Sequence, residues 1–192
     1  MTWASDVRLA GGQTATFNGT SSYGQASGQV VDTSKSYSVA AWVRLTDKSA
    51  DRTLVAKDAS GWASLYFQYL KSADRWVAQM PSATSGTTTW WVARSTSVPQ
   101  TNVWTHLTTV YDAVQDTLNL YVNGSLESTV TGVVGFNDAT GPSISAGAGR
   151  GQRGGRAASP TCRSLTGSWC RTTSPASWPR TRSREDSTSP GS

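Results

Sequence analysis

The chain has 192 residues and a formal net charge of +5 at pH 7, a length that fits one domain with a substantial core. The charge does not indicate a nucleic-acid surface, because the basic excess lies at one end of the chain. Residues 149–192 carry eight arginines against Glu185 and Asp186, whereas residues 1–148 carry nine basic and ten acidic side chains. A nucleic-acid interface needs a basic face on the folded part, so a nucleic-acid partner is not expected.

The lengths of the apolar runs and the positions of the cysteines argue against further classes of protein. No apolar stretch approaches the roughly 20 residues that cross a bilayer, and the first residues lack the basic and apolar regions of a signal peptide. Both cysteines, Cys162 and Cys170, lie near the C-terminus, so residues 1–148 need no disulfide. The start of the chain resembles the middle of a domain, and we expect an N-terminally truncated piece of a larger protein.

Period-two alternation of apolar residues predicts a series of short strands in residues 1–148 and no helix. In chain order, the predicted strands are 37–45, 53–57, 62–70, 75–80, 90–95, 103–112, 117–124, 125–130 and 142–147. Asn123 and Gly124 supply the two positive-φ residues of a type I′ hairpin turn. Short strands at this spacing predict an all-β fold, an antiparallel β-sandwich or jelly roll. The pattern leaves the oligomeric state open.

Residues 149–192 have a different composition. They contain no Val, Ile, Phe or Tyr, and Leu165 is their only large aliphatic residue. A segment so poor in strand formers buries too little apolar surface to offset its ordering entropy, so we predict a disordered, basic, low-complexity tail without a strand. Arg, Ser, Pro and Thr with stray Trp and Cys are typical of a GC-rich gene read out of frame. We interpret the tail as a frameshift or truncation product in preference to a genuine interaction arm.

Five segments follow one another along the chain: FNGTSSYG (17–24), DTSKSYSVAAWVRL (32–45), TLVAKD (53–58), VWTHLTTVYD (103–112) and LNLYVNG (118–124). Together they resemble the laminin-G-like jelly roll, a branch of the concanavalin A-like lectin/glucanase superfamily found in bacterial secreted proteins. The resemblance covers roughly residues 10–148 and implies an extracellular, secreted protein. It does not fix the function, because this superfamily includes lectins, enzymes and adhesion modules.

The residues argue against an enzyme. A retaining glycosidase needs two carboxylates about 5 Å apart, and residues 1–148 contain a single glutamate, Glu127, and no strand with paired acidic residues. The only histidine, His106, lies between Trp104 and Thr108 in the alternating pattern of a predicted strand. This position favours a structural, hydrogen-bonded histidine over a general base. No catalytic residue is predicted.

The resemblance also implies a calcium site at the rim of the sandwich, where Asp and Asn oxygens would be ligands. Asp112, Asn123 and Asp138 are the candidates for such a site. Turn Asp and Asn residues usually bond their own backbone, so we assign neither a metal site nor a cofactor.

The tryptophans are the strongest indication of a binding surface. Sugar rings stack on exposed aromatic rings, and Trp90 and Trp91 are neighbours on a strand, so their side chains must point to opposite faces. The candidate ligand-face residues are Trp62, Tyr69, Trp90 and Trp91, whereas Trp42 and Trp104 are expected to fill the core.

The sequence therefore predicts a non-catalytic module that binds carbohydrate or a cell-surface partner. Two alternatives stay open: a glycoside hydrolase of the same superfamily, and a structural or adhesion spacer without a small-molecule ligand.

Overall fold

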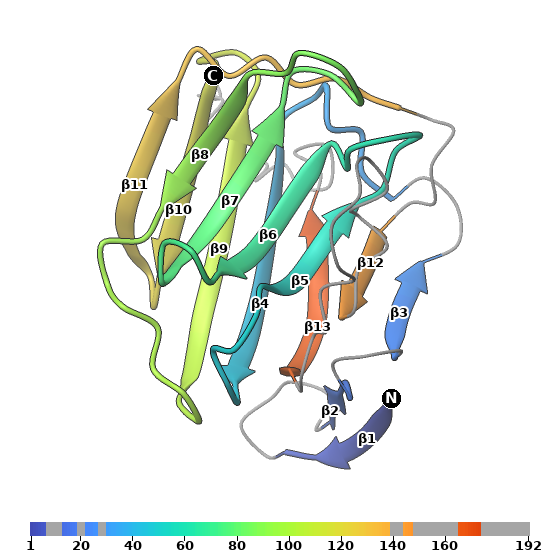
Figure 1. The fold of residues 1–192 in the computed structure, drawn as a ribbon, viewed down its shortest axis with the longest axis vertical. Helices are drawn as coiled ribbons and strands as arrows, with labels where there is room; N and C mark the ends of the chain where they lie inside the picture. The colour runs from blue at the N-terminus through green and yellow to red at the C-terminus, as the bar shows by residue number, and fades with distance from the viewer. Residues whose placement is uncertain (7–12, 19–21, 27–29, 139–143, 148–164, 174–192) are drawn as a thin grey trace, which may run out of the picture.

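The computed structural model describes residues 1–6, 13–18, 22–26, 30–138, 144–147 and 165–173, and within them it contains strands and turns but no helix (Figure 1). This part of the chain therefore includes no apolar helix long enough to cross a membrane. The strands are β1 (Thr2–Ser5), β2 (Gln13–Thr16), β3 (Tyr23–Ala26), β4 (Tyr37–Leu45), β5 (Arg52–Lys57), β6 (Leu65–Leu70), β7 (Arg75–Pro81), β8 (Trp90–Arg94), β9 (Trp104–Asp112), β10 (Thr117–Val122), β11 (Ser125–Thr131), β12 (Ile144–Gly147) and β13 (Leu165–Thr173).

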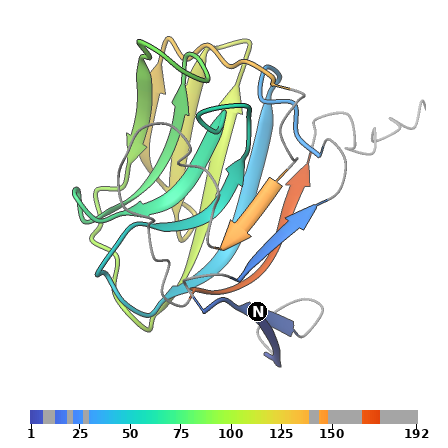
Figure 2. The same cartoon turned by 45° about the vertical axis from the view of Figure 1, so that its right-hand side comes forward.

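The strands form two antiparallel sheets packed face to face. One has seven strands in the order β1-β2-β13-β4-β9-β10-β11, and the other has six in the order β3-β12-β5-β6-β7-β8. The six-stranded sheet lies in front in Figure 1, and the two layers separate in the turned view of Figure 2. The protein is an all-β sandwich, as its alternation pattern predicts.

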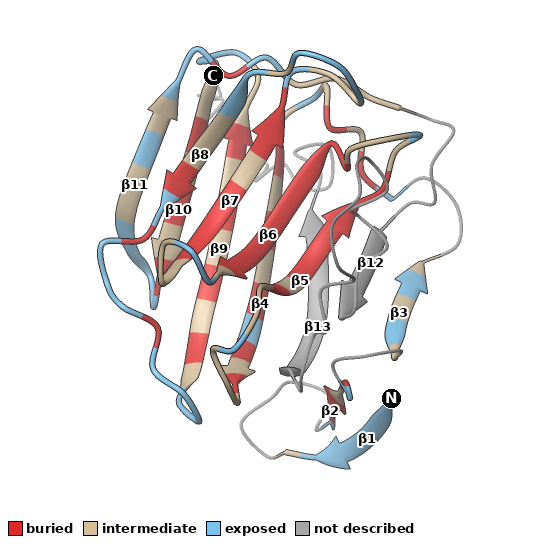
Figure 3. Cartoon of the chain, in the orientation of Figure 1, coloured by how far each residue is buried: buried red, intermediate tan, exposed pale blue. Residues whose placement is uncertain are grey.

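The core fills the space between the sheets because each strand turns alternate side chains inward. In β4 the odd-numbered residues from Tyr37 to Leu45 are buried, and β9 and β10 alternate in the same way. The six-stranded sheet contributes Leu65, Phe67 and Tyr69 from β6, and β7 adds Trp76. Strands β5 to β7 are the most continuously buried part of the fold in Figure 3.

Most predicted strands are confirmed, with three differences at individual positions. The strand predicted at 62–70 begins at Leu65, because Gly61 and Trp62 belong to the loop before it. Trp42, expected in the core, is 42% exposed. It shares the outer face of β4 with Arg44 because the odd-numbered residues already fill the inner face. Trp104 is half-buried on the same outer face, where the Arg44 guanidinium carbon lies 5.6 Å from its ring centroid.

The predicted absence of strands from residues 149–192 is wrong for Leu165–Thr173. This segment, β13, pairs with β2 on one side and with β4 on the other. A strand inserted between two others pairs through its backbone on both sides, which does not require a β-branched sequence. The rest of the predicted tail, residues 149–164 and 174–192, lies outside the described residues.

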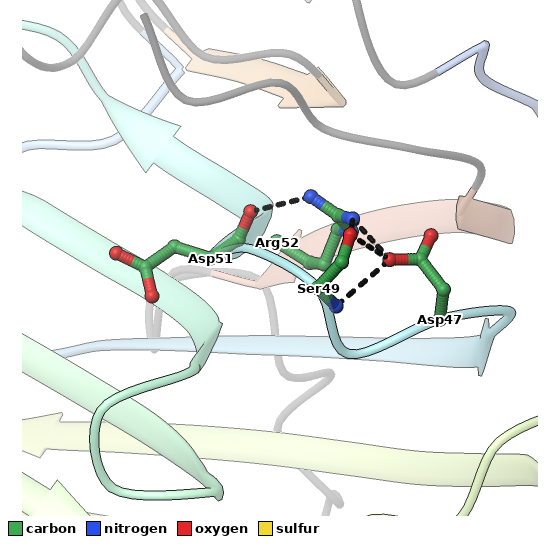
Figure 4. Close-up of polar contacts among 4 residues, drawn as sticks. All are labelled: Asp47, Ser49, Asp51 and Arg52. Atoms are coloured by element: carbon green, nitrogen blue, oxygen red, sulfur yellow. Dashed lines mark hydrogen bonds and ion pairs between the residues drawn. The ribbon is translucent and has the colours of Figure 1, made fainter. Parts of the chain in front are cut away.

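A buried arginine organises the loop between β4 and β5. Arg52 is fully buried, and its guanidinium forms an ion pair with Asp47 and donates to Ser49 Oγ at 2.9 Å and to the Asp51 carbonyl at 3.1 Å. Figure 4 shows the Arg52 guanidinium and the N–H and hydroxyl of Ser49 converging on one oxygen of the Asp47 carboxylate, while the Asp51 carbonyl accepts from the guanidinium alone. Partial burial opposes ionisation of Asp47, but hydrogen bonds from Ser49 and Arg52 outweigh it and hold the pKa of the carboxyl below its usual value.

Candidate functional site

Three aromatic side chains meet on the outer face of the six-stranded sheet; we call Trp62, Tyr66 and Trp90 the outer aromatic cluster. The ring centroids of Trp62 and Trp90 are 5.7 Å apart with an interplanar angle of 77°. Tyr66 and Trp90 are 6.0 Å apart at 43°. Edge-to-face pairs of this kind contribute about 0.5–1.5 kcal/mol beyond burial, so the rings hold one another in defined orientations.

The three rings differ in their access to solvent. Trp90 is 37% exposed, whereas Tyr66 is 4% exposed and packs with Ala56 and Ala63 in a small apolar cluster separate from the main core. The Tyr66 hydroxyl accepts a hydrogen bond from the Ala63 backbone N–H at 3.0 Å, and burial raises the pKa of Tyr66. Tyr66 thus packs beneath Trp90 as a buried support. Trp90 presents the accessible ring surface together with the half-buried Trp62.

Trp62 is held by contact between two loops. Its backbone N–H donates to the carbonyl oxygen of Thr84 at 2.6 Å. A Cβ added to Gly61 would stand 2.1 Å from the same oxygen, a separation that no side chain tolerates. Only glycine therefore allows the loop before β6 to lie against the loop between β7 and β8.

The loop between β7 and β8 presents hydroxyl groups and no charge beside the cluster. Its sequence, SATSGTTT at residues 82–89, contains only Ser, Thr, Ala and Gly. Ser82 and Thr89 close the base of the loop: Ser82 N–H donates to the Thr89 carbonyl at 2.9 Å, and Thr89 N–H donates to Ser82 Oγ at 3.0 Å. At its tip, Gly86 has a φ of 76°, which favours glycine. Hydroxyls of this kind both donate and accept hydrogen bonds.

A buried charged group lies at the start of the segment that leads to Trp62. Lys57 is buried, and its ammonium donates to the carbonyls of Asp58 at 3.0 Å and Asp138 at 3.1 Å. The Asp138 carboxylate accepts from both the N–H and the hydroxyl of Ser60, at 2.8 and 2.7 Å. Burial lowers the pKa of Lys57, while the negative charges of Asp138, Asp58 and Asp32 oppose that shift. Ser60, two residues before Trp62, is thereby fastened to the segment after β11.

The structure brings together two of the four predicted ligand-face residues. Trp62 and Trp90 lie in the outer aromatic cluster, while Trp91 points inward and packs against the main core, so the prediction that neighbouring tryptophans face opposite ways is confirmed. Tyr69 is 1% exposed and donates its hydroxyl to Asp74 at 2.9 Å. Tyr69 is therefore not available at this surface.

Tyr66 was missed, although the sequence contains a signal for it. Along a strand, side chains two positions apart share a face, so Tyr66 shares a face with Gln68 while Tyr69 lies on the opposite one. Burial, followed by the hydrogen bond to Asp74, raises the pKa of Tyr69 to about 12, as suits a core tyrosine.

The three candidate calcium ligands do not come together. Asp112 ends β9, and its carboxylate accepts from Val114 and Gln115 N–H at 2.8 and 3.1 Å. Asn123 follows the opposite end of β10, where its side chain accepts from His106 N–H at 2.9 Å. Within the part of the chain that the structure describes, no three His, Cys, Asp or Glu residues are grouped as metal ligands would be.

His106 and Glu127 have structural surroundings. The His106 ring lies 5.1 Å from the Trp42 ring on the outer face of the seven-stranded sheet. The Glu127 carboxylate accepts from Ser97 N–H and hydroxyl at 3.0 and 2.9 Å, which ties β11 to the loop after β8. The two residues make no contact that would assemble a catalytic pair in the described structure.

Comparison with known families gives one match over most of the chain. A laminin-G-type family model, described as "Concanavalin A-like lectin/glucanases superfamily", matches residues 18–159. Comparison with curated protein sequences gives no match.

Solved structures with the same fold include domains LG4-5 of the mouse laminin α1 chain, with 12% identity and a TM-score of 0.57. That alignment covers 84% of this chain and 42% of the laminin chain, so this chain spans less than half of that relative. Domain 4 of AbnA, an extracellular arabinanase of Geobacillus stearothermophilus solved with arabinotriose, is 18% identical with a TM-score of 0.54, covering 86% and 73% of the two chains. The carbohydrate-binding module (CBM40) of the Ruminococcus gnavus IT-sialidase is 14% identical with a TM-score of 0.53, covering 72% and 76%. At these identities the likeness shows the fold alone.

Proposed function

The chain belongs to the Concanavalin A-like lectin/glucanases superfamily, and from this premise we propose that it is a non-catalytic module that binds carbohydrate through the outer aromatic cluster. The observation that carries the proposal is the partly exposed Trp90 ring, fixed at 5.7 Å from Trp62 beside a loop of hydroxyl side chains. Apolar ring faces for stacking and hydroxyls for hydrogen bonds are the two kinds of group that sugar recognition needs.

The family and its structural relatives support this proposal without fixing the ligand. The AbnA domain was solved with arabinotriose, and the R. gnavus domain is named as a carbohydrate-binding module. AbnA is also an extracellular enzyme by its description, and we propose an extracellular location for this module, with a glycan or a cell-surface glycoconjugate as its partner and without a bound cofactor.

Binding to a glycan array, followed by titration calorimetry with the best-bound glycan, tests the proposal. Trp90→Ala and Trp62→Ala should each weaken binding by on the order of tenfold, about 1.4 kcal/mol, because each removes a stacking surface. Trp42→Ala is the matched control, since Trp42 is exposed to a similar extent on the opposite sheet.

Unchanged affinity in both Trp62→Ala and Trp90→Ala would place the site elsewhere. Absence of binding to every glycan on the array would refute the proposal and favour a spacer or adhesion role.

A further inference from the structure

The outer aromatic cluster also restricts the class of glycan, and this inference rests on the proposed function. We propose that its ligand is a soluble, uncharged glycan chain or chain end, bound one sugar ring at a time, and not the flat surface of an insoluble polysaccharide or an acidic glycan. The geometry of the rings and the charges around them support the two halves of this proposal separately.

The ring angles oppose a flat ligand. A flat polysaccharide surface can stack on several aromatic rings at once only where those rings lie in one plane. Here the planes of Trp62 and Trp90 differ by 77°, and those of Tyr66 and Trp90 by 43°. A flat ligand that stacks on the Trp90 ring therefore cannot stack on the Trp62 ring as well. The two tryptophans form a corner.

The corner offers stacking surface for one sugar unit. The two ring centroids are 5.7 Å apart, the spacing of two aromatic rings in direct contact, so no sugar ring fits between them. One sugar can stack on Trp90 while its edge contacts Trp62, and its hydroxyls then face the Ser and Thr side chains of residues 82–89. Tyr66, at 4% exposure, adds no further stacking surface.

The charges beside the corner oppose an acidic ligand. The loop at 82–89 has no positive charge. Lys57, five residues before Trp62 along the chain, is buried, and its ammonium donates to the backbone carbonyls of Asp58 and Asp138. The ammonium is thus already engaged and is not presented to a carboxylated or sulfated sugar.

One exposed cation lies on the same strand as Trp90, and it provides a decisive variant. Arg94 is exposed at the end of β8, four residues from Trp90, which is about 13 Å along a strand. This distance exceeds the length of one sugar ring, so Arg94→Gln should leave the affinity for an uncharged oligosaccharide unchanged.

The experiment compares three ligand classes with the full chain. Titration calorimetry uses soluble neutral oligosaccharides of glucose, xylose, mannose and arabinose. Depletion assays use microcrystalline cellulose and chitin, and acidic binding is measured with polygalacturonate and heparin at low and moderate salt. We expect binding to at least one neutral oligosaccharide, at least tenfold weaker in Trp90→Ala, unchanged in Arg94→Gln and insensitive to salt.

Two results would overturn the inference while leaving carbohydrate binding intact. One is depletion by cellulose or chitin that is lost in Trp90→Ala. The other is salt-sensitive binding to polygalacturonate or heparin that is lost in Arg94→Gln. If none of the glycans binds, the proposed function itself fails, and this inference fails with it.

Discussion

Gly61 lies so close to Thr84 that the carbonyl oxygen of Thr84 occupies the space of a side chain on Gly61: a Cβ there would be 2.1 Å from that oxygen. The same oxygen accepts the N–H of Trp62 at 2.6 Å. One carbonyl thus fixes both the path of the loop before β6 and the position of a ring in the outer aromatic cluster.

Replacing Gly61 should therefore weaken binding while the two sheets remain folded. In Gly61→Ala the two loops must separate, which breaks the Trp62–Thr84 hydrogen bond and moves the Trp62 ring; strain of this kind typically costs about 1–3 kcal/mol. We expect on the order of tenfold weaker binding to the glycan that the parent binds best, with the β-sheet circular dichroism signal retained. Gly24→Ala is the control, because an added Cβ there meets only Met1 Sδ at 4.0 Å. Equal affinity in Gly61→Ala and the parent would contradict this account.

Glu127 should have no role in hydrolysis. Its carboxylate is engaged by both hydrogen-bond donors of Ser97, and the described structure offers no second carboxylate paired with it as glycosidase chemistry requires. We expect no release of reducing sugar from β-glucans by the purified chain. Activity that persists through repurification and disappears in Glu127→Gln would overturn this expectation.

Acid should weaken the fold through Asp47. The folded-state pKa of Asp47 is lowered from its usual value of 3.8, so its contribution to stability is fully present above that value and is lost as the pH falls through the lowered pKa. Asp47→Asn should be less stable than the parent at neutral pH, because the buried Arg52 loses its ion pair, and this deficit should shrink as the pH falls through the lowered pKa of Asp47. Urea unfolding across the pH range measures the deficit. Asp116→Asn, in an exposed turn with a φ of 51° that Asn tolerates, is the matched control for the Asp-to-Asn change itself.

Removing the C-terminal segment should destabilise the sandwich. Without residues 149–192, β2 loses the neighbour that joins it to β4, and both strands expose unpaired backbone groups. We expect the truncated chain to unfold at a temperature lower by on the order of 5 °C or more and to aggregate in size-exclusion chromatography. A truncated chain that remains monomeric with the parent's unfolding temperature would show that β13 adds nothing to the fold.

The sequence was sufficient for the sandwich and for part of the site. The alternation in YSVAAWVRL specifies which side chains of β4 face the core. The same alternation places Trp42 on the outer face, whereas the usual burial of tryptophan side chains led to its prediction in the core. On β6, strict period two places Tyr66 and Tyr69 on opposite faces, and it is Tyr69, predicted at the surface, that lies in the main core.

Other features depend on contacts between distant segments, which no local pattern encodes. The glycine requirement at Gly61 arises from Thr84, and the burial of Lys57 depends on the carbonyl of Asp138. β13 was not predicted because its composition carries no strand signal, and its place comes from the gap between β2 and β4.

The position of β13 also sets an order of events during synthesis. The contacts Thr166–Thr16 and Leu165–Leu45 join the last described strand to early ones, so the seven-stranded sheet cannot close until residues 165–173 have left the ribosome. Until then, the hairpin of β1 and β2 has no sheet to join, and the outer edge of β4 stays open to other chains. Because non-local pairing of this kind slows folding, the nascent protein should depend on chaperones for longer than a sandwich whose neighbouring strands follow one another in sequence.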